Sequence, residues 1–242
     1  MLFVKEDQHR KMGKQLWRPG NMVYPVPAVM VSLADKNGKP NIITVAWTGT
    51  VCSDPPMAYI SVRKERYSHP ILMETKEFVI NLTTKQLAKA TDFCGVRSGA
   101  EVDKFHEMHL TPKKASKVMA PLIEESPVNI ECKVKQVIEL GSHDMFLAEV
   151  VAVQVDEAYM DEKNHFDLKA AGLIAYSHGQ YLLLGETIGT FGYSVRRDHA
   201  GSKKTMTKNA RVKKINRKGH MEVKKAGSNK RRAERKNKNN QS

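Results

Sequence analysis

The sequence has 242 residues, 40% of them hydrophobic, which suffices for the packed core of one substantial domain or two small ones. Its formal net charge of +14 is concentrated near the C-terminus: residues 196–242 hold 18 Lys and Arg against three acidic residues, and residues 1–195 are almost neutral. Because Met1–Gly20 is charged throughout and no apolar run approaches the roughly 20 residues of a membrane span, we expect neither a secretory signal nor a transmembrane segment.

The first regular elements in chain order are predicted to be β-strands. Val26–Leu33 and Asn41–Trp47 are apolar and β-branched, and Asn37-Gly38 lies between them. Asn-Gly tolerates the positive φ angles of a type I′ turn, so this pattern predicts a hairpin. A third strand is expected over Met57–Val62 and a fourth over Phe78–Leu82.

Helices are expected to be few and short. Thr83–Gln86 has the pattern of a capping box, which predicts a helix to about Phe93 that ends at Gly95. Ser98–Glu101 has the same pattern and predicts a second helix, which contains Asp103-Lys104-Phe105.

Two more hairpins follow in the chain. Their strands are rich in residues that favour β-structure, and their turns contain glycine. Many strands joined by tight turns, with few helices, predict a mainly β barrel or sandwich. The expected strand pairs are Val128–Leu140 with Met145–Val155, around Gly141–Asp144, and Leu173–Tyr176 with Tyr181–Leu184, around His178-Gly179.

Residues 196–242 form a basic tail. It contains almost no large apolar side chains, so it cannot offset the entropy cost of ordering, and we expect it to be disordered. The sequence therefore predicts one domain over residues 1–195 and a tail over 196–242. The concentrated positive charge suits contact with a polyanion such as RNA, and a solubilising tail without a partner is the alternative.

The usual catalytic and nucleotide-binding motifs are absent from the sequence. No glycine-rich Rossmann turn, Walker loop or GxSxG elbow is present. His106 and His109 lack further ligands nearby, so we expect surface histidines and no metal site. The three cysteines, Cys52, Cys94 and Cys132, form no metal or disulfide pattern, which favours a reducing, cytoplasmic location; Cys94 is expected to be a buried structural thiol.

Residues 41–69 are the candidate binding region. Small hydroxyl residues alternate there with apolar ones, and the stretch ends in a bend rich in Arg, Ser and His. Arg63, Arg66 and Ser68 can donate hydrogen bonds to a phosphate, and a helix starting near His69-Pro70 would add its dipole. A half-buried strand followed by an ordinary charged turn is the alternative interpretation.

An ordered set of segments over about residues 20–195 resembles the flavin reductase-like proteins with an FMN-binding split barrel, which include the flavoredoxins. The basic tail has no counterpart in that family pattern. The matching segments are Asn41-Ile42-x-Thr44-x-Ala46-Trp47, Ser53-Asp54-Pro55-Pro56, Ser61-Val62-x-x-x-Arg66-Tyr67-Ser68, Glu77–Asn81, Gly95-x-x-Ser98-Gly99-x-x-x-Asp103-Lys104-Phe105, Gly185-Glu186 and Phe191-Gly192-Tyr193.

The resemblance implies a split β-barrel that forms a homodimer and holds non-covalent FMN at the subunit interface. It implies that the strand over Thr44–Thr48 lies along the isoalloxazine and contacts it through backbone groups, and that the turn over Arg63–His69 receives the phosphate. No catalytic acid or base is assigned, and His178 is expected to be a surface turn residue, with approach to the flavin in a dimer as the alternative. The expected cofactor-binding residues are Thr44, Val45, Ala46, Trp47, Thr48, Cys52, Arg63, Arg66, Tyr67, Ser68, His69 and Asn81.

Three functions are consistent with these expectations. The first is an NAD(P)H-dependent flavin or ferric reductase that passes electrons through FMN to an acceptor. The second is a flavoredoxin-like electron carrier that is reduced by a partner protein. The third is a nucleic-acid-associated protein that acts through its basic tail. The electron donor and acceptor stay open at this point.

Overall fold

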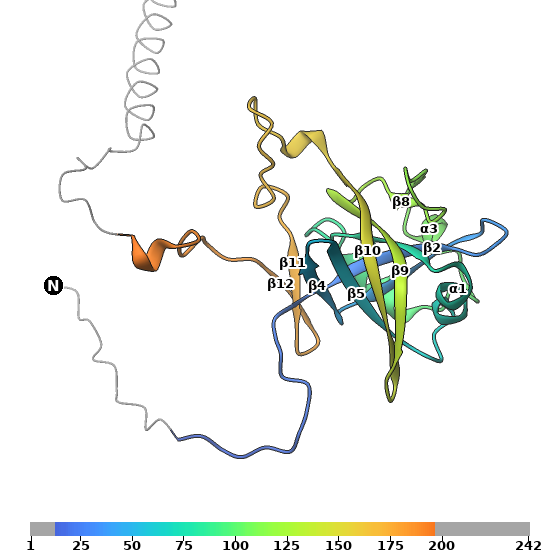
Figure 1. Cartoon of the computed structure of the whole chain (residues 1–242), viewed down its shortest axis with the longest axis horizontal. Helices are drawn as coiled ribbons and strands as arrows, with labels where there is room; N and C mark the ends of the chain where they lie inside the picture. The colour runs from blue at the N-terminus through green and yellow to red at the C-terminus, as the bar shows by residue number, and fades with distance from the viewer. Residues whose placement is uncertain (1–12, 197–242) are drawn as a thin grey trace, which may run out of the picture. The chain divides into compact units, whose positions relative to one another are not determined.

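The computed structural model describes residues 13–196, shown in colour in Figure 1. Backbone contacts divide the chain into two units, Met1–Glu186 and Thr187–Ser242. The described part of the second unit contains one short 3₁₀-helix, Tyr193–Val195. Apart from Arg196, the predicted tail lies outside the described residues, so the predicted domain boundary stays a prediction. Within residues 13–196, no helix combines the length and the apolar character that crossing a membrane requires.

The first unit is built on an antiparallel seven-stranded sheet with the strand order β3-β2-β6-β9-β10-β5-β4. Strands β9 and β10 form the long ribbon visible in Figure 1. The strands are β2 (Val29–Ala34), β3 (Pro40–Val45), β4 (Thr48–Ser53), β5 (Pro56–Arg63), β6 (Glu77–Asn81), β9 (Val128–Glu139) and β10 (His143–Val155).

Two small sheets and a few short helices complete this unit. One sheet has the order β1-β11-β12, and the other pairs β7 with β8. These strands are β1 (Val26–Pro27), β7 (Pro112–Lys113), β8 (Leu122–Ile123), β11 (Ile174–Ser177) and β12 (Gln180–Leu183). The helices are α1 (Ser68–Thr75), α2 (Ala88–Val96), α3 (Lys104–Glu107) and a 3₁₀-helix over Glu157–Tyr159.

The large sheet curls into a barrel because its two edge strands are consecutive in the chain. Only Ala46 and Trp47 separate the end of β3 from the start of β4. The Ser61 N–H of β5 donates to the Trp47 carbonyl at 2.8 Å, which holds this link against the sheet. On the other side of the link β3 pairs only with β2. The barrel therefore has a seam where β3 and β5 separate.

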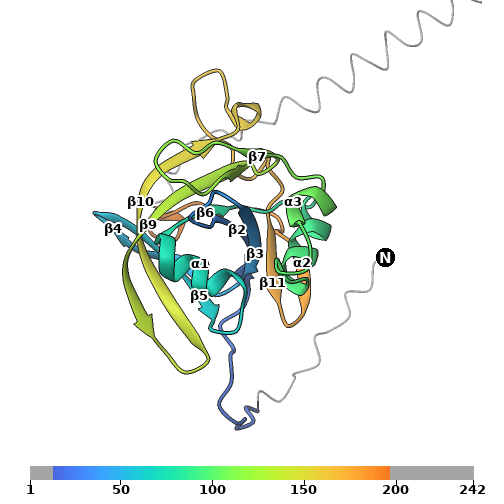
Figure 2. The same cartoon turned by 90° about the vertical axis from the view of Figure 1, so that its right-hand side faces the viewer.

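Both faces of β2 and β3 are buried. Alternate residues such as Val31 and Ile43 point into the barrel, where they pack with Phe78 and Phe146. The intervening residues Met30 and Ile42 pack outward against Cys94 of α2 and Phe105 of α3. Figure 2 shows α2 and α3 side by side near β3. This packing brings the segment that joins the two helices close to the barrel seam.

The predicted mainly β architecture with few, short helices is confirmed, and so are the three predicted hairpins. The predicted type I′ turn of the first hairpin was wrong. Gly38 has a φ of 82°, but Asn37 is not among the described residues with positive φ, and the Asp35 carboxylate accepts from the Asn37 N–H at 2.8 Å. The Asp35 carboxylate thus stabilises a turn in which only Gly38 has a positive φ. The type I′ pattern of two positive φ angles instead occurs at His178 (47°) and Gly179 (81°).

The predicted helix starts were also wrong. The Thr83 hydroxyl donates to the Ala28 carbonyl, and Thr84 forms a β-bridge with Leu173, so α2 begins only at Ala88 and runs through Gly95. In the second case the N-cap is Asp103, whose carboxylate accepts from the N–H groups of the next turn. The separate strand β4 was missed because its Thr-Gly-Thr start lacks a run of large apolar residues.

Candidate functional site

Three cavities follow one another along the seam between β3 and β5, and each shares lining residues with the next; together they are called the groove. Its middle section is formed by Ile43–Trp47 on one side and by Ser61–Arg63 on the other. It continues at one end into a basic cavity and at the other into a wider, aromatic cavity. The groove follows the one edge of β3 that carries no neighbouring strand.

The backbone of β3 presents free polar groups to this groove. The Asn81 side chain donates to the Met30 carbonyl, so the Met30 carbonyl points toward β6 and away from its partner Thr44. Backbone groups alternate in direction along a strand, so those of Ile42, Thr44 and Ala46 point to the open edge. In agreement, the Ile42 carbonyl accepts a hydrogen bond from Lys104 rather than from β2. The edge can therefore hydrogen-bond a planar polar ring.

The basic cavity at one end has a volume of about 360 Å³ and is lined by three cations, Arg66, Arg97 and Lys104, and by the hydroxyl residues Ser68 and Ser98. One carboxylate, Glu65, also lines it and is paired with Arg63 at 3.0 Å. Lys104 is only 4% exposed. Its ammonium donates to the carbonyls of Ile42 at 2.7 Å and Cys94 at 2.8 Å.

Lys104 has no negative partner in the part of the chain that the structure describes. None of the ion pairs found within residues 13–196 includes Lys104 or Arg66. The pKa of Lys104 is lowered to about 8, mainly by burial; Cys94 opposes this shift and the nearby charge of Arg66 adds to it. A buried cation without a carboxylate is costly unless an anion joins it. The cavity therefore fits a phosphate group.

The loop before α3 approaches this cavity closely. A Cβ atom on Gly99 would lie 2.1 Å from the Asn41 Oδ1 atom, so any larger residue would displace Asn41. Asn41 in turn donates from Nδ2 to the Ser68 Oγ at 2.9 Å, and both side chains are buried. Gly99 and Asn41 thus fix the position of the Ser68 hydroxyl at the basic cavity.

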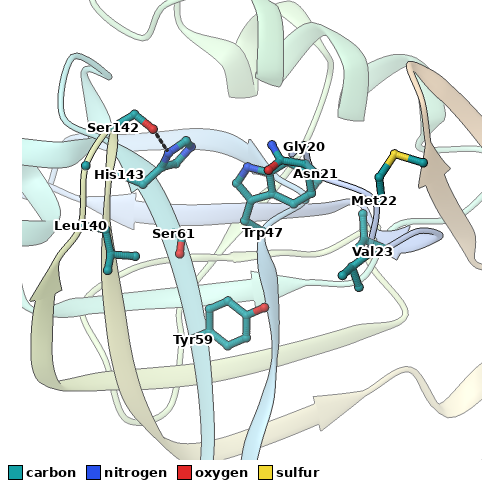
Figure 3. A pocket seen from close by; sticks show the side chains of 13 residues that line it. Gly20, Asn21, Met22, Val23, Trp47, Tyr59, Ser61, Leu140, Ser142 and His143 are labelled. Atoms are coloured by element: carbon teal, nitrogen blue, oxygen red, sulfur yellow. Dashed lines mark hydrogen bonds between the residues drawn. The ribbon is translucent and has the colours of Figure 1, made fainter. Parts of the chain in front are cut away.

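The wider cavity at the other end has a volume of about 590 Å³. Trp47 and Tyr59 supply aromatic walls, and Ser61 and His143 supply polar groups (Figure 3). The His143 Nδ1 atom lies 2.8 Å from the Ser142 hydroxyl. Burial, with the nearby charge of Arg63, keeps the pKa of His143 below its ordinary value, so its imidazole is neutral at pH 7.

Eight of the twelve predicted site residues line the groove or its basic cavity. They come from two segments that are separate in the sequence: the end of β3 with the link to β4, and the turn that joins β5 to α1. These residues are Thr44, Val45, Ala46, Trp47, Arg63, Arg66, Tyr67 and Ser68.

The other four predicted residues do not line it. Thr48 is buried and donates to the Tyr59 carbonyl at 2.6 Å, and Cys52 lies at the far end of β4 near Asp54. Asn81 is fully buried and hydrogen-bonds β2 and Ile123.

His69, the fourth of these residues, lies in the first turn of α1 and is not part of the groove lining. Its Nε2 atom lies 2.7 Å from the Asp144 carboxylate. These four residues carry polar groups or a thiol that could contact a cofactor, but their side chains do not line the groove.

Sequence reasoning missed Lys104, Arg97, Ser98, Tyr59 and His143 as groove residues. Lys104 carried a usable signal, because it stands between Asp103 and Phe105 in a matching segment, on a helix that packs against the core. Ser98 belongs to the same matching segment and carried the same signal. Arg97 lies beside it in the loop between α2 and α3, and Tyr59 and His143 lie on β5 and β10; none of these three was marked by a pattern in the sequence.

Comparisons with known proteins agree with this geometry. The sequence profile of the family described as flavin reductase like domain matches residues 21–182. The fold superimposes on flavoredoxin of Desulfovibrio vulgaris (Miyazaki F) with a TM-score of 0.71 and 29% identity, covering 76% of this chain and all of that one.

Two relatives found by sequence have lower coverage of this chain. A protein of Archaeoglobus fulgidus without an assigned function is 32% identical over 131 residues, which are 54% of this chain and 74% of the relative. The FMN reductase (NADH) RutF of Pantoea ananatis is 22% identical over 143 residues, which are 57% of this chain and 73% of the relative.

Proposed function

Because this chain belongs to the flavin reductase-like family of FMN-binding oxidoreductases, we propose that it holds non-covalent FMN in the seam between β3 and β5. The observation that carries this proposal is the buried ammonium of Lys104, which lines a cavity with two arginines and has no carboxylate partner within residues 13–196. A terminal phosphate supplies the missing negative charge.

The chemistry of the groove indicates which end would hold the phosphate of FMN and which would hold its ring. Arg66, Lys104 and Ser68 hold the phosphate, with Ser68 fixed by Asn41. The backbone groups of Thr44 and Ala46 at the open edge of β3 would offer hydrogen bonds to the isoalloxazine. The middle section of the groove connects the basic cavity with the aromatic cavity. No strand pairs with β3 along this section, because it is the seam of the barrel.

Bound FMN supplies hydride and single-electron chemistry, and the protein supplies placement and electrostatics. Trp47 and Tyr59 form the apolar walls of the wider cavity and limit the access of water to the ring. His143, neutral at pH 7, can accept a proton from, or donate a hydrogen bond to, a substrate at the junction of this cavity and the groove. The reaction is electron transfer from a reduced donor through FMN to an acceptor.

We propose NADH or NADPH as the donor and a flavin or a ferric complex as the acceptor. The similarity to RutF, whose name records an NADH-dependent FMN reductase, supports this assignment. No lysine or arginine lines the aromatic cavity, so its lining offers no cation for a dinucleotide pyrophosphate. A nicotinamide would therefore enter that cavity by its ring and leave its phosphates in solvent.

An electron carrier reduced by a partner protein is the second candidate. One observation favours it: flavoredoxin superimposes along its whole length on this chain. Such a carrier would keep FMN bound throughout its cycle and would need no site for a nicotinamide.

Anaerobic mixing of the FMN-loaded protein with NADH or NADPH separates the two functions. Bleaching of the flavin absorbance within seconds, at a rate that saturates with nicotinamide concentration, supports the reductase. Bleaching that requires a protein donor such as a ferredoxin supports the carrier. A protein that binds no added FMN refutes both.

A further inference from the structure

The turn over residues 63–69 and the start of β10 both lie across the groove from β3. Each also has side chains that point away from the groove. The turn over residues 63–69 points Arg66 and Ser68 toward the basic cavity. The first residue of β10, His143, lines the groove, and the next residue, Asp144, points to the opposite side because strand residues alternate. The side chain of Asp144 is only 5% exposed.

On this far side the Asp144 carboxylate contacts the turn twice. Its Oδ2 atom lies 2.7 Å from the His69 Nε2 atom. Its Oδ1 atom has no aligned hydrogen-bond donor, but the Lys64 ammonium lies 3.2 Å away and balances its charge. Lys64 also reaches the exposed Glu139 at 3.7 Å. One carboxylate on β10 thus joins both ends of the turn that carries Arg66.

The His69–Asp144 pair is held rigidly. The His69 ring packs edge-on against Phe146, with 5.6 Å between the ring centroids, and Phe146 is fully buried in the barrel core. Burial alone would raise the pKa of Asp144, but the contacts with His69 and Lys64 bring it below the ordinary value, so the carboxylate is ionised. A buried carboxylate held by polar partners is weak evidence for added stability, and a geometric role explains the contacts of Asp144 better.

We propose that Asp144 is a positioning residue for the cofactor. Through His69 and Lys64 it clamps the turn over residues 63–69 to β10, and this clamp holds Arg66 and Ser68 in register with the phosphate of FMN. The inference rests on the proposed FMN site. The contacts within the turn do not replace the clamp. The Arg66 N–H donates to the Arg63 carbonyl at 3.1 Å and the His69 N–H to the Arg66 carbonyl at 2.8 Å, but these bonds shape the turn without joining its side chains to β10. The Arg63–Glu65 ion pair is exposed and joins neighbours in sequence.

The test compares the binding of FMN and riboflavin, which lacks the phosphate, by quenching of flavin fluorescence. In Asp144→Asn the charge is lost with little change in volume, and we expect FMN to bind about tenfold more weakly and riboflavin less than about threefold. His69→Ala is the second variant and should show the same phosphate-selective loss. Glu139→Gln, which removes only the exposed partner of Lys64, is the matched control and should bind both flavins as the wild type does.

The outcomes separate this inference from the proposed function. Wild-type protein that binds no FMN refutes the proposed function itself. Wild-type binding with unchanged FMN affinity in both variants overturns the positioning role, as does an equal loss of FMN and riboflavin affinity. Failure of both variants to fold, judged by circular dichroism and thermal unfolding, would assign the pair to the stability of the barrel and overturn it as well.

Discussion

Replacing Lys104 by methionine tests the phosphate site most directly. The substitution keeps an unbranched chain of similar length and removes the ammonium that lines the basic cavity. A hydrogen bond to a charged group contributes about 1.5–3 kcal/mol, and 1.4 kcal/mol corresponds to a tenfold change in affinity. We therefore expect FMN to bind about 10- to 100-fold more weakly, while riboflavin binds with nearly unchanged affinity.

The pH dependence gives a second, independent signature of Lys104. Without FMN its pKa is lowered to about 8, and a bound phosphate must raise it, because the two opposite charges stabilise each other. Above pH 8 FMN binding in the wild type must therefore take up a proton, and the dissociation constant should rise by up to about tenfold per pH unit. In Lys104→Met this rise should be absent.

Both effects can be measured by titrating flavin fluorescence between pH 7 and pH 10. Lys113→Met, which removes an exposed lysine paired with Glu124 at 2.7 Å, is the control for a general loss of positive charge. If Lys104→Met folds and binds FMN as tightly as the wild type at pH 7, with the same pH dependence, the phosphate does not occupy this cavity and the placement of FMN is wrong. A parallel loss of riboflavin affinity would show that the substitution distorts the groove.

Four further predictions follow from the same structure and sequence. Gly99→Ala should displace Asn41 from Ser68 and weaken FMN binding about tenfold, as measured by fluorescence titration; unchanged affinity would remove this contact from the site. Glu131→Gln should lower the free energy of unfolding in urea by about 1.5–3 kcal/mol at pH 7, because the buried carboxylate accepts from both N–H groups of residues 116–117. Although burial raises the pKa of Glu131, its hydrogen bonds bring it below the ordinary value, so this stabilisation is present above the unfolded pKa and should vanish as the pH falls through the folded one. Light scattering of the FMN-loaded protein should give a dimer of about twice 27.3 kDa, and a monomer that retains FMN would contradict the predicted shared site. Truncation after Ser194 should leave FMN binding intact and abolish salt-sensitive retention on heparin or RNA, and loss of FMN binding would place part of the tail in the fold.

The sequence by itself determined the elements whose cause is local. Alternating β-branched residues and a glycine-containing turn predicted the β9–β10 hairpin correctly. His178-Gly179 closes the last hairpin in the same way, because glycine adopts positive φ without strain. The family resemblance pointed to the turn over Arg63–His69, and two of its residues, Arg66 and Ser68, line the basic cavity; the binding of a phosphate there stays a prediction.

Long-range contacts determined where helix α2 begins, against the local helix-capping pattern. Thr83-Thr84 has the composition of a helix cap, yet Thr83 hydrogen-bonds Ala28 and Thr84 pairs with Leu173, so the helix starts later. No pattern within the segment reveals these partners, which lie 55 and 89 residues away in the chain.

The direction of each side chain was decided only by the tertiary structure. His69 and Ser68 are neighbours in a turn that suits phosphate binding, but only Ser68 faces the cavity, while His69 binds Asp144 of a strand 75 residues away. Lys104 reaches the groove because α3 packs on the outer face of β3, where the Ile42 carbonyl is left free at the edge of the sheet. Sequence thus supplied the charged and polar groups, and the closure of the sheet around its seam determined which of them meet, because a binding site requires groups from separate segments to converge in space.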